Sequence, residues 1–459
     1  MYHQTIMKRR TFLHASAVLA AAAALPGCGE NTAADTATTA SAPTTLRTAH
    51  IGVGNMGLED LQAVASHPKV TVTALCDVDQ NHLDAAHALF LDAKVYADYR
   101  KLLAEMDGEL DAVVVSTPDH THAPASLAAM ERDLHVYCQK PLTHHVSEAR
   151  AMRRTAADRG LTTQMGIQVH SFYDYKLATQ LIQSGLIGKV KTVYAWSPKN
   201  WGYDGPVPEA TAADPIPETL DWNLWLGTAA ERPYRADLYH PMNWRKLVDY
   251  GCGTLGDMGV HIFDTPYNAL ALDVPTTIRT ECRPPNGFGF PEKNVVTYTF
   301  PATDYTTDDF RWIWYDGPGA PAEGDVPTLP GGDALPEQGA YFVGEDGDLL
   351  LPHFMELPRK IKDGAYVDLT EAIAAQGLDE PVRDYASESP KHYHQWVDAC
   401  LGQGECTAPF DYGARLTETI LLGTIAGRFP GETLAWDAAA GKFAREEANV
   451  FLVGEEREF

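Results

Sequence analysis

The chain has 459 residues, 36 Lys and Arg against 62 Asp and Glu, a formal net charge of −26, and 45% hydrophobic residues. This length is typical of two or three domains with apolar cores, because one domain takes about 100–200 residues. Nucleic-acid binders carry basic patches, so we expect no nucleic-acid partner. Seven cysteines without a Cys-x-x-Cys pair exclude a disulfide scaffold and a structural zinc module.

The first 45 residues are predicted to lie outside the fold. The basic cluster Lys8-Arg9-Arg10 precedes Thr11-Phe12-Leu13 and an apolar run from Ala15 to Leu25. That run is too short to span a bilayer, which needs about 20 residues, but it suits the core of a signal peptide. The arrangement resembles a twin-arginine export signal.

Leu25-Pro26-Gly27-Cys28 resembles a bacterial lipobox, in which Cys28 becomes lipidated and tethers the chain to a membrane. We therefore predict a signal peptide over 1–27 and a flexible Thr/Ala/Ser-rich tether over 28–45. The expected location is the periplasmic side of the cell envelope. The pairing of the other six cysteines stays open at this point.

A nucleotide-binding pattern begins at residue 48. An apolar strand runs from Thr48 into Gly52-x-Gly54-x-x-Gly57, a helix is expected over 58–66, and a second strand over 70–75 ends near Asp77. The glycines permit a tight turn, and the helix N-terminus attracts a pyrophosphate. Asp77 can accept hydrogen bonds from ribose hydroxyls and repels a 2′-phosphate, which predicts NAD rather than NADP.

Alternating strands and helices continue to residue 168. Strands are expected over 111–116, 134–137 and 162–166, with helices ending at Met130 and over 146–159. This rhythm predicts a doubly wound, mostly parallel α/β sheet that binds ligands at the carboxyl ends of its strands. The histidines of His120-x-His122 and His144-His145 have no acidic or Cys ligand at a supporting spacing, so we expect polar lining and no metal.

The pattern changes after residue 168. A helix is expected over 177–184 and a strand over 191–196, and segments of alternating polarity follow at 276–280, 295–300, 310–315, 341–343 and 348–351. They predict a mainly antiparallel open sheet within an α+β domain. Residues 316–340 are expected to be a solvated insertion, and helices are expected over 392–401 and 415–426. We therefore divide the mature chain into an NAD-binding domain, 46–168, and a substrate-binding and oligomerisation domain, 169–459.

Asp257 and His261 follow a glycine-rich turn at a spacing of four residues. On a helix they share one face, where a carboxylate can fix the tautomer of an imidazole and raise its basicity. Such a pair suits general-base catalysis near neutral pH. An Asp–His pair that only pins the helix is the alternative.

Four motifs in order resemble the Gfo/Idh/MocA oxidoreductases: Gly52-Val-Gly-Asn-Met-Gly57, Cys76-Asp-Val-Asp79, Ser116-Thr-Pro-Asp-His-Thr-His122 and Gln139-Lys140-Pro141. The resemblance covers residue 46 to the C-terminus and implies NAD(P)-dependent dehydrogenation of sugars, inositols or their derivatives. Two positions depart from the family pattern. Gln139 replaces a glutamate and removes a charge beside Lys140, and Ile167 replaces the asparagine of a Gly-Asn-Gln pattern.

The resemblance and the residue chemistry together imply a set of site residues. Lys140, Asp257 and His261 are the catalytic candidates. The expected cofactor contacts are Gly52, Gly54, Asn55, Met56, Gly57, Asp77, Thr117, Pro118, His122, Gln139 and Lys140. Aromatic faces and forked donors suit sugar rings, so the expected substrate contacts are His170, Trp201, Tyr203, Trp244 and Arg245, besides Asp257 and His261.

These residues predict an enzyme that oxidises a secondary hydroxyl of a sugar, polyol or sugar derivative. An exported enzyme meets no free NAD supply, so we expect a tightly held cofactor. Two alternatives stay open: an NAD-dependent glycosidase that oxidises its sugar transiently without net redox change, and a non-catalytic sugar-binding lipoprotein. The resemblance also implies a homo-oligomer.

Overall fold

A computed structural model describes residues 44–209, 211–378, 384–454 and 457–459. The predicted signal peptide, the lipid attachment at Cys28 and nearly all of the tether lie outside the described residues. Within these ranges, no helix is both long and apolar enough to cross a membrane. The six described cysteines are unpaired.

Six parallel strands form the first sheet, in the order β3-β2-β1-β4-β5-β6. Strand β4 is buried along its whole length, as expected of a strand covered on both faces. This arrangement confirms the predicted doubly wound α/β sheet. The strands are β1 (Leu46–Ile51), β2 (Val70–Cys76), β3 (Lys94–Tyr96), β4 (Ala112–Val115), β5 (His135–Gln139) and β6 (Thr163–Gly166).

The connecting helices begin and end at recognisable capping residues. Asp79 and Asp98 accept backbone N–H bonds at the starts of α2 and α3, and Gly160 ends α5 at φ 62°. The segments α2, β3 and α3 are additions to the predicted elements. The helices are α1 (Met56–Ala65), α2 (Gln80–His87), α3 (Tyr99–Glu105), α4 (Asp119–Met130) and α5 (Val146–Arg159).

A ten-stranded sheet forms the second half, in the order β14-β13-β12-β11-β7-β10-β9-β8-β15-β16. Neighbouring strands are antiparallel except β7 and β10, which confirms the predicted mainly antiparallel sheet. The strands are β7 (Val190–Ser197), β8 (Thr277–Glu281), β9 (Asn294–Thr299), β10 (Thr306–Asp316), β11 (Gln338–Gly344), β12 (Asp348–His353), β13 (Arg359–Lys362), β14 (Ala365–Val367), β15 (Thr433–Asp437) and β16 (Lys442–Phe443).

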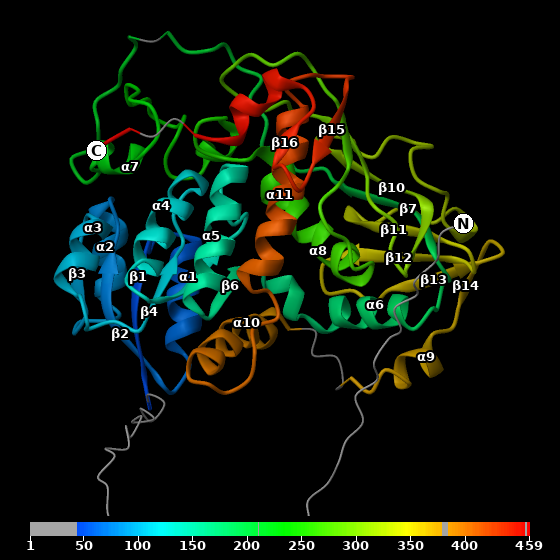
Figure 1. Ribbon diagram of the computed structural model, residues 1–459, viewed down its shortest axis with the longest axis horizontal. Coiled ribbons are helices and arrows are strands. Elements are labelled where there is room, and N and C mark those ends of the chain that lie inside the picture. The colour runs from blue at the N-terminus through cyan, green and yellow to red at the C-terminus, as the bar shows by residue number, and fades with distance from the viewer. Residues whose placement is uncertain (1–43, 210, 379–383, 455–456) are drawn as a thin grey trace, which may run out of the picture. The chain divides into compact units, whose positions relative to one another are not determined.

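Helices join the two sheets into one core. Helix α11 contacts both α5 and β8, and Figure 1 shows it in orange between the blue and the yellow sheets. Phe263 stacks on Trp312 at 4.1 Å between ring centroids and anchors α8 to β10. The remaining helices are α6 (Tyr173–Gln183), α7 (Trp222–Leu226), α8 (Val260–Ala269), α9 (Thr370–Ala374), α10 (Tyr385–Cys400) and α11 (Phe410–Ala426). Short turns are η1 (Gln168–Ser171), η2 (Asn243–Lys246), η3 (Leu255–Gly259), η4 (Pro330–Gly332) and η5 (Glu446–Leu452).

Helix α10 packs against the first sheet although it follows the second along the chain. Its Tyr393 and Trp396 are fully buried and lie 5.1 and 5.7 Å from the ring of Tyr137 in β5. The nucleotide-binding half is therefore completed by a C-terminal helix.

The predicted solvated insertion 316–340 needs correction. Many of its residues are exposed or half-buried, but Val326 and Leu329 are buried against Trp196 and Tyr341 of the second sheet. The indole N–H of Trp196 also donates to the carbonyl of Pro336 at 3.0 Å. The segment is thus an anchored cover, because two apolar side chains within its polar sequence fill a pocket of the sheet face.

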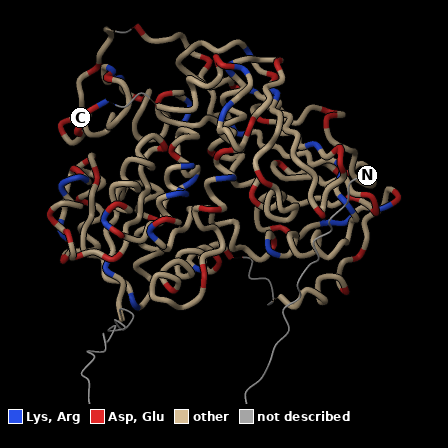
Figure 2. Tube along the Cα trace, in the orientation of Figure 1, with Lys and Arg blue, Asp and Glu red and all other residues tan. Residues whose placement is uncertain are grey.

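Acidic side chains are spread over the described chain. Figure 2 shows Asp and Glu residues interspersed with Lys and Arg along the trace of both halves. The charge of −26 is therefore not carried by one acidic segment.

Candidate active site

The glycine-rich loop after β1 leaves no room for a side chain at its three glycine positions. A Cβ on Gly52, whose φ is 82°, would lie 2.7 Å from the carbonyl oxygen of Ser116, and one on Gly57 would lie 2.2 Å from the carbonyl oxygen of Gly52. A Cβ on Gly54 would meet the ring of His82 at 2.2 Å. The loop leads directly into α1, whose N-terminus carries the positive end of the helix dipole and favours a phosphate.

Asp77 lies at the carboxyl end of β2, beside this loop. Its carboxylate accepts the backbone N–H groups of Val53 and Asp79, both at 2.9 Å. The side chain is 9% exposed and lies 3.7 Å from Nδ1 of His82. A fixed carboxylate here can receive ribose hydroxyls and opposes a 2′-phosphate, so these residues fit NAD.

One cavity of about 720 Å³ extends from the glycine-rich loop to the second half of the chain. It is lined by Lys140, Asp257 and His261 as well as by Asp77, so the predicted nucleotide and catalytic residues share one space. Of the remaining predicted residues, the lining includes Gly52, Gly54, Asn55, Met56, Thr117, Pro118, His122, Gln139, Trp244 and Arg245. Gly57, His170, Trp201 and Tyr203 do not line this cavity.

Lys140 and Asp257 form an ion pair at the wall of the cavity. The Lys140 ammonium donates to Oδ1 of Asp257 at 2.9 Å and to its carbonyl at 3.1 Å. Arg245 Nε donates to Oδ1 at 3.2 Å and Trp201 Nε1 to Oδ2 at 2.6 Å. Burial raises the pKa of Asp257, but the charges of Lys140 and Arg245 outweigh it and hold that pKa well below its ordinary value.

His261 is half-buried beside this pair and has one ring nitrogen without a hydrogen-bond partner among the described residues. Its Nδ1 has no hydrogen-bond partner in the described part of the chain. Burial, reinforced by the charge of Lys140, lowers the pKa of His261 well below its ordinary value. The imidazole is therefore neutral, and its ring lines the cavity.

The expected hydrogen bond between Asp257 and His261 is not formed within the described residues. Three donors occupy the Asp257 carboxylate instead, and its effect on His261 is that of a nearby charge, which raises the pKa of the imidazole. The two residues span a π-helical turn, η3, and the start of α8. Single π-helical turns occur often at functional sites.

Gln139 is explained by a buried carboxylate on α1. Its amide donates to both oxygens of Asp60 at 3.0 Å, and Asp60 also accepts the hydroxyls of Ser116 and Tyr393, each at 2.6 Å. Burial raises the pKa of Asp60 to about 6. A glutamate at 139 would face this carboxylate, whereas the amide complements it. The charge beside Lys140 is supplied by Asp257.

The same network includes Gln168. Its amide donates to the hydroxyl of Tyr393 at 2.7 Å. Gly166 leaves the space that the Gln139 side chain needs, since a Cβ there would lie 2.8 Å from Cδ of Gln139. The unusual segment Gly166-Ile167-Gln168 thus serves the same buried cluster, and Gln168 lines the cavity as Gln139 does.

The predicted substrate contacts divide into two groups. Trp244 and Arg245 line the cavity, with the guanidinium 4.2 Å from the indole centroid. His170 instead pairs with buried Asp264 at 2.8 Å. Tyr203 donates its hydroxyl to the carbonyl of Pro206.

The sequence analysis expected several histidines to be polar lining. In the structure, the ring nitrogens of these histidines contact backbone carbonyl oxygens. His120 Nε2 lies 3.1 Å from the oxygen of Trp225, and His144 Nε2 lies 3.1 Å from those of Val248 and Gly251. His122 lies 2.9 Å from the oxygen of Pro141 and 2.8 Å from that of Thr117, and so ties two strand-end loops together.

Sequence reasoning missed further residues of the cavity wall, among them three histidines, Asp119, Phe354 and Tyr385. Asp119 stands within the motif Ser116–His122 and could have been found there; burial raises its pKa to about 7. The others come from separate segments without a local signal. The three histidines are His82, His240 and His353.

Comparison with known proteins identifies the family. Residues 46–167 match "Oxidoreductase family, NAD-binding Rossmann fold", and residues 173–313 match "Oxidoreductase family, C-terminal alpha/beta domain", the two parts of GFO_IDH_MocA. The chain belongs to the Gfo/Idh/MocA oxidoreductase family. Its N-terminal half is the NAD-binding domain of that family, and NAD is its cofactor.

Individual Gfo/Idh/MocA relatives match only part of the chain. Inositol 2-dehydrogenase of Salmonella typhimurium is 28% identical over 153 residues, 33% of this chain and 45% of that protein. A glycosyl hydrolase family 109 protein of Stenotrophomonas maltophilia is 30% identical over 194 residues, 40% of each chain. The chain therefore aligns with less than half the length of these relatives. The solved structure of GenD2 from gentamicin A biosynthesis, in complex with NAD, has a TM-score of 0.59 at 20% identity and covers 87% of this chain and 98% of its own.

Proposed function

We propose that this chain is an NAD-dependent oxidoreductase that moves a hydride between NAD and a secondary hydroxyl of a sugar, polyol or sugar derivative. One observation carries the proposal: a single cavity is lined by the dinucleotide loop and by Lys140, Asp257 and His261. The similarity to inositol 2-dehydrogenase, 28% identical over 153 residues, supports a polyhydroxylated substrate.

The side chains suit the proton transfer that accompanies hydride transfer. Bound NAD supplies the hydride acceptor. His261 is neutral and lines the cavity, and it takes the proton of the substrate hydroxyl. Lys140 donates a hydrogen bond to the same oxygen and stabilises its developing charge. Asp257 holds the Lys140 ammonium in place at 2.9 Å.

Arg245 and Trp244 supply the means to orient a ring-shaped substrate. The guanidinium stacks on the indole and donates to Asp257, which fixes its plane at the cavity wall. An aromatic face and a forked donor suit the apolar face and the hydroxyls of a pyranose or an inositol.

The proposal is tested with the purified protein. Denaturation followed by nucleotide assay shows whether NAD is retained, and a panel of sugars, polyols and glycosides with added NAD is followed by NADH absorbance. We expect NADH formation with at least one polyhydroxylated compound. Saturated NAD binding combined with no redox change on any compound, with or without an added electron acceptor, would contradict net dehydrogenation.

A glycosidase that oxidises its substrate transiently is the second candidate. The similarity to a glycosyl hydrolase family 109 protein favours it. In that case the same His261 and Lys140 act on a glycoside, and the cofactor returns to its starting state after each turnover. Release of the aglycone without accumulation of NADH separates this activity from net oxidation.

We propose in addition that the chain is exported, lipidated at Cys28 and homo-oligomeric. The basic cluster Lys8-Arg9-Arg10, the apolar run after it and the lipobox-like Leu25–Cys28 support export and anchoring. A captive cofactor fits an enzyme without a nucleotide supply. Cell fractionation of a Cys28→Ser variant tests the anchor, since a soluble wild-type protein would contradict it.

A further inference from the structure

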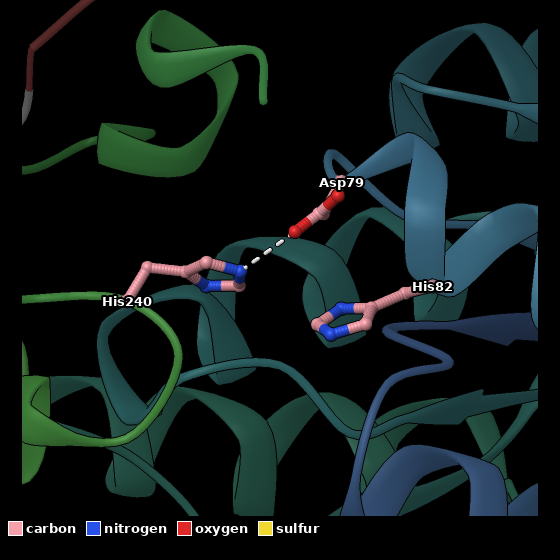
Figure 3. A group of neighbouring side chains, drawn as sticks. All are labelled: Asp79, His82 and His240. Atoms are coloured by element: carbon pink, nitrogen blue, oxygen red, sulfur yellow. Dashed lines mark hydrogen bonds and ion pairs between the residues drawn. The ribbon is translucent and has the colours of Figure 1, made fainter. Parts of the chain in front are cut away.

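We propose that Asp79, His82 and His240 form a binding site for a divalent transition-metal ion such as Zn²⁺ at the nucleotide end of the cavity. One ligand atom from each of the three lies within 4.8 Å of the others (Figure 3). Two imidazoles and one carboxylate are a donor set that such ions prefer. The site goes beyond the proposed reaction and does not depend on it.

The three side chains come from two segments that the fold holds together. Asp79 is the N-cap of α2 and His82 stands three residues later, so both lie at the first turn of one helix. His240 comes from the segment before η2, and Figure 3 shows its ring pointing toward the other two. Its Nε2 lies 2.9 Å from Oδ2 of Asp79.

The carboxylate has one oxygen available for an ion. Oδ1 of Asp79 accepts the backbone N–H of Asn81 at 3.0 Å, which leaves Oδ2 directed at His240. The side chain of Asp79 is 11% exposed and that of His240 15%, so the site is sheltered. The backbone around Asp79 is fixed by a bridge to Leu220, which limits its movement.

The surrounding charge favours a cation. A second carboxylate, Asp77, has an oxygen 3.7 Å from Nδ1 of His82, so two acidic side chains lie next to the two imidazoles. Metal–ligand bonds of about 2.0–2.2 Å place the donors of a tetrahedral site roughly 3.3 Å apart. The three ligand atoms now lie up to 4.8 Å apart, and rotation of the His82 and His240 rings brings them to the distance that the ion requires.

Three protein ligands leave at least one position of the ion open. His82 and His240 line the dinucleotide cavity, so that position faces the space for the cofactor. A bound ion would join the β2–α2 turn to the segment carrying His240 across the mouth of this space. Binding of Zn²⁺ is thus expected to raise the thermal midpoint of the protein.

The test uses the full chain, stripped with a chelator and then titrated with Co²⁺ and Zn²⁺. We expect one equivalent of Co²⁺ to produce visible d–d absorption without a thiolate charge-transfer band. His82→Ala and His240→Ala should each weaken Zn²⁺ binding, measured by calorimetry, by more than about tenfold, the loss seen even for groups behind the ligands. His87→Ala, at the opposite end of α2 from Asp79 and His82, should bind like the wild type.

Equal Zn²⁺ affinity in the wild type and both variants would overturn the site. A loss of Zn²⁺ affinity in His82→Ala but not in His240→Ala would also overturn the site, because it would assign His82 to the nucleotide pocket instead. His82 has 25% side-chain exposure, so its removal leaves the fold intact. The thermal midpoint in chelator checks each variant, and an unchanged midpoint on adding Zn²⁺ to the wild type would also contradict the proposal.

Discussion

Replacing Gln139 by glutamate tests the network of buried polar side chains at the wall of the cavity. The amide now donates to both oxygens of Asp60 at 3.0 Å, in a region without solvent access. In Gln139→Glu two carboxylates would meet there, and they could not both ionise without a large cost. Asp60 already has a pKa raised to about 6 by burial, so it is poorly able to accept a further negative neighbour.

The expected loss in the free energy of unfolding is about 3–5 kcal/mol at pH 7.5. Two further pKa units of like-charge repulsion amount to about 3 kcal/mol, and the loss of hydrogen bonds to a charged acceptor adds about 1.5 kcal/mol or more. The carboxyl pair has a folded pKa above its unfolded value. The variant therefore keeps its stability at low pH, where the two carboxyl groups share a bound proton. It loses that stability as the pH rises through the pKa of the pair in the folded state.

Urea unfolding at pH 5 and pH 7.5 measures this difference. Gln139→Glu should lose about 1–2 kcal/mol at pH 5 and the full amount at pH 7.5. The double variant Asp60→Asn/Gln139→Glu restores one carboxylate and one amide and should recover most of the loss. Gln183→Glu, an exposed position, is the matched control. A Gln139→Glu protein as stable as the wild type at pH 7.5 would refute the reasoning.

Three other substitutions probe separate parts of the structure. Asp77→Ser removes the carboxylate that opposes a 2′-phosphate, so the ratio of NADP to NAD affinity, measured by fluorescence titration, should rise by about tenfold or more; an unchanged ratio would count against this role of Asp77. Gly57→Ala places a Cβ 2.2 Å from the carbonyl of Gly52 and should abolish retention of nucleotide while the second half stays folded; retained nucleotide would show that the loop can widen. Arg150→Met removes the ion-pair partner of the Glu418 carboxylate, which is 5% exposed and keeps only the indole N–H of Trp436, and should lower the free energy of unfolding in urea by about 3 kcal/mol. Arg153→Met removes one partner of the exposed pair with Asp411 and should lower it by less than about 1 kcal/mol. Equal losses in the two variants would contradict the difference in burial between the two pairs.

The nucleotide-binding half could be predicted from sequence because its signals are local. The glycines of the loop, Asp77 and the apolar strands follow one another at fixed spacing, and each reflects the geometry of one βαβ unit. The short elements α2, β3 and α3 escaped prediction because three to eight residues carry little periodicity. Val326 and Leu329 were missed because two apolar residues in a polar segment give no pattern.

The residues of the candidate site were predicted in part, but their contacts with one another were not. Spacing brings Asp257 and His261 to one helical face, yet the partners of Asp257 arrive from Lys140 and Trp201, far away in sequence. Long-range pairing of this kind leaves no trace in a local window. The same holds for His353 and Tyr385, which reach the cavity from strand β12 and helix α10.

Gln139 illustrates how a departure from a family motif becomes interpretable. In the sequence it is a missing charge beside a lysine. In the structure it is the donor that a buried acid, Asp60, requires. The sequence contains both residues, but nothing in it relates position 60 to position 139.

The central claim is that Lys140 and His261 act on a substrate hydroxyl in a cavity shared with NAD. Single-turnover absorbance at the NADH band, with a substrate found in the compound panel, tests it most directly. Lys140→Met and His261→Ala should each slow hydride transfer by about 10²–10⁴-fold while NAD stays bound, and Lys101→Met, on the exposed side of α3, should react like the wild type. Transfer at wild-type rates in both site variants would contradict the account.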